Sequence, residues 1–471
     1  MPFDPQELLK VLDGALRFER NEVRVVDEAR LRQKVEDLVE ISALETGPRQ
    51  GWARYLVRMA ALELGIVPCS IHEVYMARGR GEIPPTFTVP ALNLRVLPFF
   101  GARAAFRVAQ ELNAAAVIFE IARSEIGYTA QRPAEYATAI LAAAIAEGWR
   151  GQVFIQGDHF QVSARRYATS PEEELHAVRE LTREAIHAGF FNIDIDTSTL
   201  VDIHKPDLDE QQKLNYQLSA AFSAFIREIE PPGVTVSIGG EIGEVGGHNS
   251  TEPELRAFME GYRNELARYT TRPGLSKISI QTGTSHGGVI LPDGRIAEVE
   301  VDFETLRTLS RVARQDYGLA GAVQHGASTL PEEAFGKFVE SEACEVHLAT
   351  NFMNIFFDLM PQELRQEMYA WLDVNALGER KAGMSDAQFY YKTRKNALGP
   401  FKAQIYALPA EVKERLSQAW EAQFRRLFPA LGLRDTRPII ERYACPMLIT
   451  PRLSDYVVEA ATTEDVSDLA D

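Results

Sequence analysis

The chain repeats one pattern, a helix followed by a strand, across residues 101–198, and this stretch decides the fold. It reads GARAAFRVAQELN (101–113) before AAAVIFEIA (114–122), AEYATAILAAAIAEGW (134–149) before QVFIQGDH (152–159), and PEEELHAVRELTREAIHAG (171–189) before FFNIDIDTS (190–198). Apolar residues recur at helical spacing in the first member of each pair, whereas the second member is a short apolar run typical of a buried strand. Three such units in a row predict a parallel sheet with helices packed outside it.

The same alternation continues on both sides of this stretch. Further strands are predicted in TFTVPALNL (86–94), VTVSIGGEIG (234–243), LSKISIQTG (275–283), LAGAVQHG (319–326) and CEVHLATN (344–351). Together with the first three, these give eight strands, near residues 89, 116, 153, 192, 235, 278, 321 and 346. Eight sequential βα units are the pattern of a TIM barrel, an α/β fold written (β/α)8, which we predict as the catalytic domain over residues 86–360.

The segments before and after the barrel are predicted to be helical. Leucines and valines recur at helical spacing in PQELLKVLDGALRF (5–18), ARLRQKVEDLVEISALE (29–45) and WARYLVRMAALELG (52–65). We therefore expect an all-helical N-terminal extension over residues 1–85. FMNIFFDLMPQELRQEMYAWL and EVKERLSQAWEAQFRRLF predict a helical C-terminal extension over residues 361–471, which ends in an acidic tail.

The bulk composition excludes several classes of function. Of 471 residues, 50 are Lys or Arg and 67 are Asp or Glu, which gives a formal net charge of −17. Such an acidic chain lacks the clustered cations that bind a phosphate backbone, so we expect no nucleic acid partner, and the charge also disfavours anionic membranes. The three cysteines are widely spaced, and the N-terminus has no basic patch followed by an apolar run. We therefore predict a cytoplasmic protein.

Three of the nine histidines follow predicted strands. They are His159 in QGDH, His286 in GTSHGG and His325 in QHGAS. Because the loops after the strands of a TIM barrel meet at one face, imidazoles from strands three, six and seven can converge on one ion. Three protein ligands and one open position are typical of catalytic zinc. We therefore predict Zn²⁺ as the cofactor, with another divalent metal as the alternative.

Carboxylates lie beside these histidines or end neighbouring strands. Asp158 directly precedes His159, and a carboxylate adjacent to a ligand does not easily reach the same ion, so Asp158 is predicted to be a catalytic general acid or base. A loop or helix cap is its alternative. Glu241 and Asp196 end strands five and four, where a carboxylate could orient an imidazole or bind the ion at an alternative position. Glu241 is accordingly counted among the metal residues, whereas structural capping explains Asp196 equally well.

Small and hydroxyl residues at the remaining strand ends predict an anion site. Gly287, Gly326, Ser328 and Thr350 resemble a nest in which backbone N–H groups and hydroxyls surround a phosphate. TIM barrels frequently hold phosphate near their last two strands, although HGG and HGAS are also ordinary turn signals. The full predicted substrate-binding or phosphate-binding set is Asn93, Ser124, Gly287, Gly326, Ser328, Ala349 and Thr350.

The order of these motifs resembles the class II, metal-dependent fructose-bisphosphate and tagatose-bisphosphate aldolases over residues 87–358. The similar motifs are VPALNL, GDH, GGEIGEVGG, GTSHGG, QHGAS and VHLATN. The resemblance implies that His159, His286 and His325 hold zinc, that Asp158 moves the proton of a substrate oxygen, and that the glycine and hydroxyl residues bind the phosphate of a ketose. It implies reversible retro-aldol cleavage through a metal-stabilised enediolate, a role in carbohydrate metabolism such as glycolysis, and a homo-oligomer, dimer or tetramer.

Three positions depart from the family pattern. The stretch EVGGHNS (244–250) is interpreted as a mobile lid, with a surface loop as the alternative, and it carries His248 where the family has a glutamate that moves a carbon-bound proton. We interpret His248 as the replacement base. Gln156 and His347 replace a family histidine and asparagine. The alternatives to an aldolase are a ketose or keto-uronate epimerase with the same metal chemistry, and a non-catalytic aldolase-like subunit.

Overall fold

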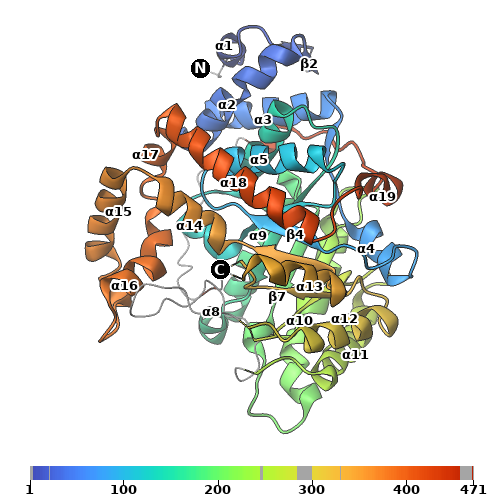
Figure 1. The fold of residues 1–471 in the computed structure, drawn as a ribbon. Helices are drawn as coiled ribbons and strands as arrows, with labels where there is room; N and C mark the ends of the chain where they lie inside the picture. The colour runs from blue at the N-terminus through green and yellow to red at the C-terminus, as the bar shows by residue number, and fades with distance from the viewer. Residues whose placement is uncertain are drawn as a thin grey trace.

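The computed structural model describes residues 4–20, 22–243, 248–283, 300–328, 330–456 and 469. Its centre is a closed barrel of parallel strands (Figure 1). Each barrel strand pairs with the next one along the chain, so that β6 (Gly151–Gln161), for example, pairs with both β5 (Ile118–Ala122) and β7 (Asn192–Asp196). The last strand, β11 (Glu345–Leu348), pairs with the first, β4 (Val89–Asn93), with Leu348 opposite Leu92, and this pairing closes the barrel. The predicted TIM barrel is confirmed. Its strands are β4 (Val89–Asn93), β5 (Ile118–Ala122), β6 (Gly151–Gln161), β7 (Asn192–Asp196), β8 (Ser237–Glu241), β9 (Lys277–Ile280), β10 (Ala322–Gln324) and β11 (Glu345–Leu348).

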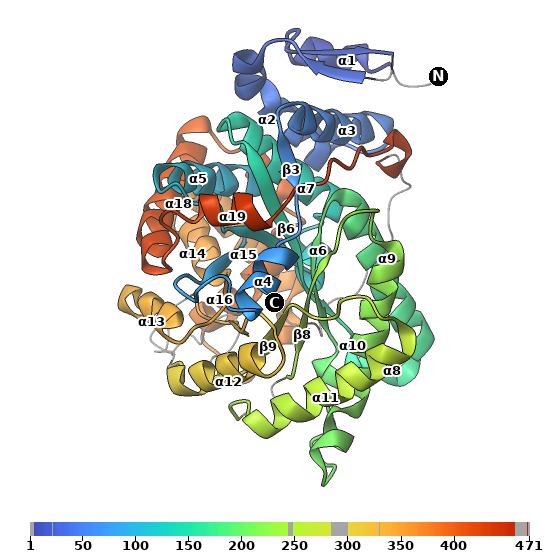
Figure 2. The same ribbon diagram turned by 90° about the vertical axis from the view of Figure 1, so that its right-hand side faces the viewer.

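Helices connect these strands and cover the outside of the barrel (Figures 1 and 2). Their starts carry local signals, such as the capping box in which the Thr251 side chain accepts from Glu254 N–H, and the aspartate cap at Asp207. They are α5 (Pro98–Glu111), α6 (Arg123–Tyr128), α7 (Pro133–Ala146), α8 (Ala164–Thr169), α9 (Pro171–Ala188), α10 (Leu208–Ile229), α11 (Glu252–Tyr269), α12 (Phe303–Gln315), α13 (Phe335–Glu340) and α14 (Thr350–Leu359).

Strand β6 does not end at His159, as we expected, but continues to Gln161. Its register against β7 shifts between Gly157 and Phe160, which marks a β-bulge, and His159 within the bulge has a left-handed backbone with φ of 38°. A Cβ at Gly157 would lie 2.4 Å from the Phe160 ring, so only glycine permits this packing. Non-glycine residues adopt positive φ rarely and at some cost, and such strain concentrates at functional sites. The bulge turns His159 out of the regular alternation of the strand.

The prediction that the N-terminal extension is all-helical is wrong. Helix α1 (Gln6–Val11) stops at a turn in which Asp13 and Gly14 have positive φ, and an antiparallel hairpin follows, formed by β1 (Leu16–Glu19) and β2 (Glu22–Val25). Alternating burial along β1 explains the strand, because Leu16 is buried and Phe18 is half-buried, whereas Arg17 and Glu19 are exposed. The extension also contains α2 (Glu28–Leu44), α3 (Pro48–Glu63), β3 (Ile66–Pro68), which pairs with the start of β6, and α4 (His72–Gly79).

The C-terminal extension is helical, as predicted, and packs against the barrel. Its longest helix, α18 (Ala410–Ala430), crosses α5 (Figure 1). The N–H of Thr88, one residue before β4, donates a hydrogen bond to the carbonyl of Leu431, one residue after α18. Gly399 N–H donates to the carbonyl of Tyr128 at the end of α6. The helices are α15 (Gln362–Asn375), α16 (Asp386–Thr393), α17 (Lys402–Tyr406), α18 (Ala410–Ala430) and α19 (Arg437–Tyr443).

Helix α7 illustrates how the extensions contribute to the core. It is alanine-rich and apolar on every side, and all its residues except Ala134 are buried. A helix that is hydrophobic all round must be covered on all sides, and α7 is in contact with α2, α3, α5 and α9. The N-terminal extension therefore completes the covering of this barrel helix. In the described part of the chain, no helix is long and apolar enough to cross a membrane.

Candidate active site

Two of the three predicted metal histidines meet at the carboxyl ends of the strands. Nε2 of His159 in the β6 bulge lies 3.1 Å from Nδ1 of His325, which directly follows β10. Both side chains are buried, and their ring centroids are 4.4 Å apart. His325 is held from its other side, because its Nε2 lies 3.0 Å from Oγ of Ser279. The third predicted ligand, His286, lies outside the described residues.

Carboxylates surround the outer nitrogen of His159. Its Nδ1 lies 3.1 Å from Asp196 Oδ2 and 3.4 Å from Glu241 Oε2. Asp196 also accepts hydrogen bonds from the backbone N–H and hydroxyl of Ser198. Burial raises the pKa of Asp196, but the hydrogen bond from His159 and the others outweigh it and lower the pKa. Asp196 is therefore an ionised acceptor that fixes the ring of His159.

This arrangement fits a bound metal ion. His159, Glu241 and His325 each offer a ligand atom, and these atoms lie within 4.8 Å of one another. Zinc–nitrogen bonds of about 2.0–2.1 Å place two ligand nitrogens roughly 3.3 Å apart, close to the observed separation of the two imidazoles. Burial lowers the pKa of His159, but Asp158, Glu241 and Asp196 outweigh it and raise the pKa well above its usual value. A cation is thus favoured at this position, whether a proton or a metal.

Asp158 points into the barrel rather than toward solvent. Its Oδ1 lies 3.2 Å from Nδ1 of His347 on β11 and 4.0 Å from Nε2 of His159. The same nitrogen of His347 lies 3.1 Å from Glu120 Oε2 on β5. Burial raises the pKa of Asp158, but His159 and His347 outweigh it and hold the pKa well below its usual value. The Asp158 carboxylate is therefore ionised and able to accept a proton.

A lysine at the centre of the barrel organises the remaining charges. Nζ of Lys277 on β9 lies 2.8 Å from Asp194 Oδ2 on β7 and 2.5 Å from Glu345 Oε1 on β11, and it donates to Gln156. Burial lowers the pKa of Lys277, but the two carboxylates raise it above its usual value.

Three carboxylates in the barrel interior, those of Glu345, Asp194 and Glu120, differ in their pKa values. Burial raises the pKa of Glu345, yet Lys277 and His347 outweigh it and leave the pKa at about 2. Burial raises the pKa of Asp194 to about 6 despite Lys277, and burial together with the charge of Asp158 raises that of Glu120 to about 7. Glu345 therefore carries the negative charge paired with Lys277, whereas Glu120 is the most easily protonated of the group.

Sequence reasoning missed Glu120, Asp194, Lys277 and Glu345, although one signal could have found them. Each is a charged residue inside a short apolar strand, in VIFEIA, FFNIDID, SKISIQ and CEVHLAT respectively. Charged residues are almost never fully buried unless they are paired. Several such strands in one barrel therefore indicate that the charges meet at its centre.

The predicted anion-binding residues are partly brought together. Ser328 after β10 and Ala349 after β11 are joined by a hydrogen bond of 2.6 Å from Ala349 N–H to Ser328 Oγ. Gly326 has a positive φ of 70°, and Thr350 is buried in the first turn of α14. These residues line the ends of the seventh and eighth barrel strands, as expected of a phosphate nest. Gly287 lies outside the described residues.

The other two predicted contact residues lie at the ends of the first two barrel strands. Asn93 Nδ2 donates to Glu125 Oε2 at 2.6 Å, and its Oδ1 accepts from Arg95 Nε at 3.2 Å. Arg95 and Glu125 form a buried ion pair at 2.7 Å. Ser124 is buried within α6, directly after β5. The amide of Asn93 is thus directed toward this buried ion pair.

His248 is not part of the buried cluster. Its side chain is exposed, and in the described part of the chain no hydrogen bond or ion pair joins it to the histidines or carboxylates above. Its neighbour Asn249 donates to Asp302 Oδ2 at 3.0 Å. Residues 244–247 of the predicted lid lie outside the described residues, so the role of His248 stays a prediction.

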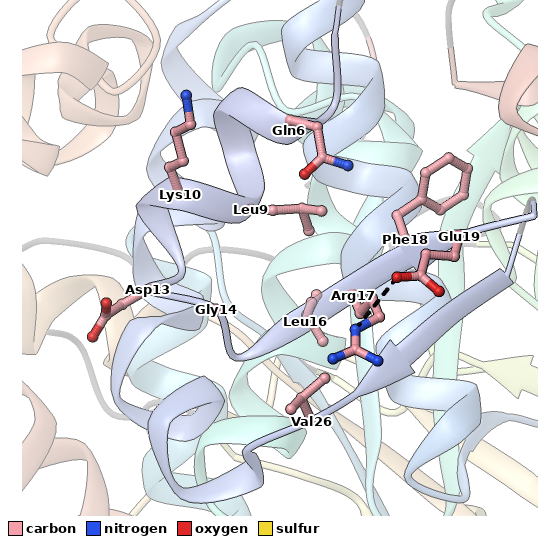
Figure 3. A pocket seen from close by; sticks show the side chains of 10 residues that line it. All are labelled: Gln6, Leu9, Lys10, Asp13, Gly14, Leu16, Arg17, Phe18, Glu19 and Val26. Atoms are coloured by element: carbon pink, nitrogen blue, oxygen red, sulfur yellow. Dashed lines mark ion pairs between the residues drawn. The ribbon is translucent and has the colours of Figure 1, made fainter.

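A separate hollow of about 560 Å³ lies in the N-terminal extension (Figure 3). Residues of α1, of the turn after it and of β1 line it, including Gln6, Lys10 and Asp13. An exposed ion pair between Arg17 and Glu19 forms part of its wall, with 3.6 Å between Nε and Oε1. Figure 2 shows this segment at the far end of the molecule from the loops after the barrel strands. The hollow therefore takes no part in the site around His159.

Several solved structures are similar to this chain. A fructose-bisphosphate aldolase from Campylobacter jejuni is 16% identical, and the alignment covers 79% of this chain and 97% of that one with a TM-score of 0.47. The YdjI aldolase from Escherichia coli is 12% identical over 76% of this chain and 97% of that one, with a TM-score of 0.44. A probable tagatose 6-phosphate kinase from Sinorhizobium meliloti is 14% identical over 76% of this chain and 99% of that one, with a TM-score of 0.51, and supports the barrel fold.

The sequence itself matches the family model described as fructose-bisphosphate aldolase class-II over residues 85–417. The matched range contains the barrel, every described residue of the site and the first helices of the C-terminal extension. Since this range is well over half of the sequence, the chain belongs to the class II fructose-bisphosphate aldolase family.

Proposed function

We propose that the protein is a metal-dependent aldehyde-lyase that cleaves a phosphorylated ketose by a reversible retro-aldol reaction. The observation that carries the proposal is the pairing of His159 with His325 at 3.1 Å, beside the ionised carboxylate of Asp158. Family membership supports the reaction class. The glycine and hydroxyl residues after β10 and β11 support a phosphate on the substrate.

Different residues of the chain have different proposed roles in this reaction. Asp158 accepts the proton of the substrate hydroxyl whose carbon becomes the aldehyde, and it returns that proton in the condensation direction. The carbon–carbon bond then breaks, and its electron pair stays on the ketone half as an enediolate. When bound, a divalent metal, Zn²⁺ by preference, supplies a Lewis acid for the oxygens of that half. Asp196 holds the ring of His159 so that Nε2 faces the metal position.

His286 is the proposed third metal ligand, with Glu241 as a further ligand or a group that orients His159. Gly287, Gly326, Ser328 and Thr350 are the proposed phosphate contacts, while Asn93, Ser124 and Ala349 complete the substrate pocket. His248 is the proposed carrier of the carbon-bound proton, brought in when residues 244–250 cover the substrate.

We also expect the enzyme to be cytoplasmic and to form a homo-oligomer, a dimer or a tetramer. Free thiols at Cys69, Cys344 and Cys445 support a reducing compartment. The expected partner is a small sugar phosphate, and we expect neither nucleic acid nor membrane binding.

The test is to incubate the zinc-loaded protein with fructose 1,6-bisphosphate, tagatose 1,6-bisphosphate and unphosphorylated ketoses, and to identify the products. An aldolase releases two trioses from a phosphorylated ketose. Conversion to a diastereomer without triose release would replace the proposal by an epimerase, and no turnover of any ketose by zinc-loaded protein would favour a non-catalytic subunit. His159→Ala should abolish turnover, whereas His187→Ala, on the exposed face of α9, should leave it unchanged.

A further inference from the structure

A groove of about 440 Å³ lies in the C-terminal extension, between α15 and α16 (Figure 1). On α15 the lining side chains are Gln362 and the residues at i+3, i+4 and i+7 from it. Ala387 and the residues with the same spacing from it, on α16 and at its end, form the opposite wall. This spacing selects one face of each helix, and such faces are typically apolar where helices pack together. Here they carry guanidinium, amide and tyrosine groups instead.

Arg394, at the end of α16, lies on the buried side of this groove. It is only 6% exposed, and its guanidinium carbon lies 4.2 Å from the centroid of the Tyr391 ring and 4.8 Å from that of Phe357. Its Nη2 group donates to Oδ1 of Asn354, whereas its Nε has no hydrogen bond. Asp358 is near enough to raise the pKa of Arg394, but burial outweighs this effect and lowers the pKa. Within the described residues, this buried guanidinium therefore has no ion-pair partner, which is unusual for a buried charge.

Further donors without acidic partners lie along the groove. Arg365 of α15 is half-buried, and its Nη1 lies 3.4 Å from the carbonyl oxygen of Phe357. No carboxylate in the described part of the chain forms an ion pair with Arg365. The hydroxyl of Tyr391 is buried without a hydrogen bond, and neither Asp nor Glu is among the lining residues. Two guanidinium groups and a hydroxyl free of carboxylates suit a phosphate, which arginine binds through paired N–H donors.

A pair of tyrosines forms the aromatic part of the lining. The rings of Tyr369 and Tyr390 are stacked, with 4.1 Å between their centroids and 7° between their planes. The Tyr390 hydroxyl donates to the carboxylate of Asp373 at 3.0 Å, which fixes the orientation of its ring. Both tyrosines are half-buried, so part of each side chain faces solvent. A flat, fixed aromatic pair of this kind can stack against a planar ring of a ligand.

We propose that the groove between α15 and α16 binds a nucleoside phosphate, with its phosphate on Arg365 and Arg394 and its base against Tyr369 and Tyr390. The volume of the groove lies within the range of small-molecule sites, about 300–1,000 Å³. None of the residues proposed for the aldolase reaction lines it. The proposal does not depend on that reaction, because it concerns binding rather than products.

The test is isothermal titration calorimetry of the full-length protein with AMP, GMP, CMP and UMP, and with ribose 5-phosphate and adenosine for comparison. At least one nucleotide is expected to bind. Ribose 5-phosphate should bind at least about 5-fold more weakly because it cannot stack. Adenosine should bind at least about 10-fold more weakly than AMP because it lacks the phosphate. The absence of binding by all four nucleotides would overturn the proposal, as would ribose 5-phosphate binding as tightly as the best nucleotide.

Two variants test the site without removing the buried Arg394. Arg365→Gln should weaken binding of the best nucleotide about 10-fold or more, since it removes a charged donor, and Tyr391→Phe about 3–10-fold, since it removes only a hydroxyl. Lys392→Gln is the matched control, because Lys392 is exposed on α16 and does not line the groove. This control should bind the nucleotide as the wild type does. An equal loss in Lys392→Gln and Arg365→Gln would indicate general attraction by charge and overturn the proposal.

Ser328→Ala separates this groove from the proposed phosphate nest after β10, and it should bind the nucleotide as the wild type does. A loss of nucleotide binding in Ser328→Ala, with Arg365→Gln unaffected, would place the nucleotide at the active site and overturn the proposal.

Discussion

Asp196 Oδ2 accepts a hydrogen bond from Nδ1 of His159 at 3.1 Å, which leaves Nε2 of the same ring facing His325. Such outer carboxylates typically contribute about 10–100-fold to metal affinity. Asp196→Asn should therefore weaken Zn²⁺ binding by about that factor while the barrel stays folded, as measured by competition with a chromogenic chelator. Asp202→Asn, at an exposed loop position, is the control and should bind Zn²⁺ as the wild type does. Equal affinities in both variants would contradict the orienting role of Asp196.

His325→Ala should remove both Zn²⁺ binding and turnover, because its Nδ1 is one of the two nitrogens that face the proposed metal position. Metal content by elemental analysis and triose release by a coupled assay would check this. His176→Ala, exposed on α9, is the matched control. A variant at position 325 that keeps full metal content would place the metal elsewhere.

Lys277→Met should destabilise the fold by about 3–5 kcal/mol, since it leaves Asp194 and Glu345 buried without their cation. The loss should be smaller at pH 5 than at pH 8, because the carboxyl pKa values rise without Lys277 and protonation then removes the repulsion. Urea unfolding at both pH values measures this. Adding Glu345→Gln should recover part of the lost stability, and a double variant no more stable than Lys277→Met would argue against the pairing.

His72 should make stability fall in acid. Burial, with Arg227 and Arg80 nearby, lowers its pKa from 6.5 to about 3, so between these values the unfolded chain binds a proton that the folded chain does not. The free energy of unfolding therefore decreases as pH falls from 6.5 toward 3, with a contribution from His72 of about 2 kcal/mol between pH 7 and pH 5. His72→Gln should lose that part of the pH dependence. Identical slopes of stability against pH in the two proteins would refute it.

Ser328→Ala should raise KM for a phosphorylated ketose about 5–10-fold with little change in kcat. The Ser328 hydroxyl is the proposed donor to the phosphate, and it accepts a hydrogen bond from the Ala349 N–H. Its removal should therefore cost about one hydrogen bond in substrate binding. Steady-state kinetics with phosphorylated and unphosphorylated substrates separate the effects. A change in kcat alone would place Ser328 outside the phosphate site.

The sequence predicts the barrel well because each strand is a local apolar run, and all eight runs became strands. It also predicts the approach of His159 to His325, since the ends of parallel strands share one face. It fails where local spacing is ambiguous. The apolar pattern of residues 5–18 reads as one helix, but Asp13 and Gly14 break it and a hairpin follows.

Other features depend on tertiary contacts that no local pattern contains. The continuation of β6 past His159 depends on the Phe160 ring packing over Gly157. The pairing of Lys277 with Asp194 and Glu345 joins three strands that are far apart in the chain. His286 and most of the predicted lid lie outside the described residues, so those assignments remain predictions.

The burial of α7 on every side has a consequence for how the barrel could be handled as a separate piece. A fragment that starts near residue 86 would lack α2 and α3, and the alanine-rich outer surface of α7 would face water. Such a surface invites self-association. A fragment intended to fold alone must therefore retain residues 28–63, so the change of sequence pattern near residue 85 is a poor guide to where the chain can be cut.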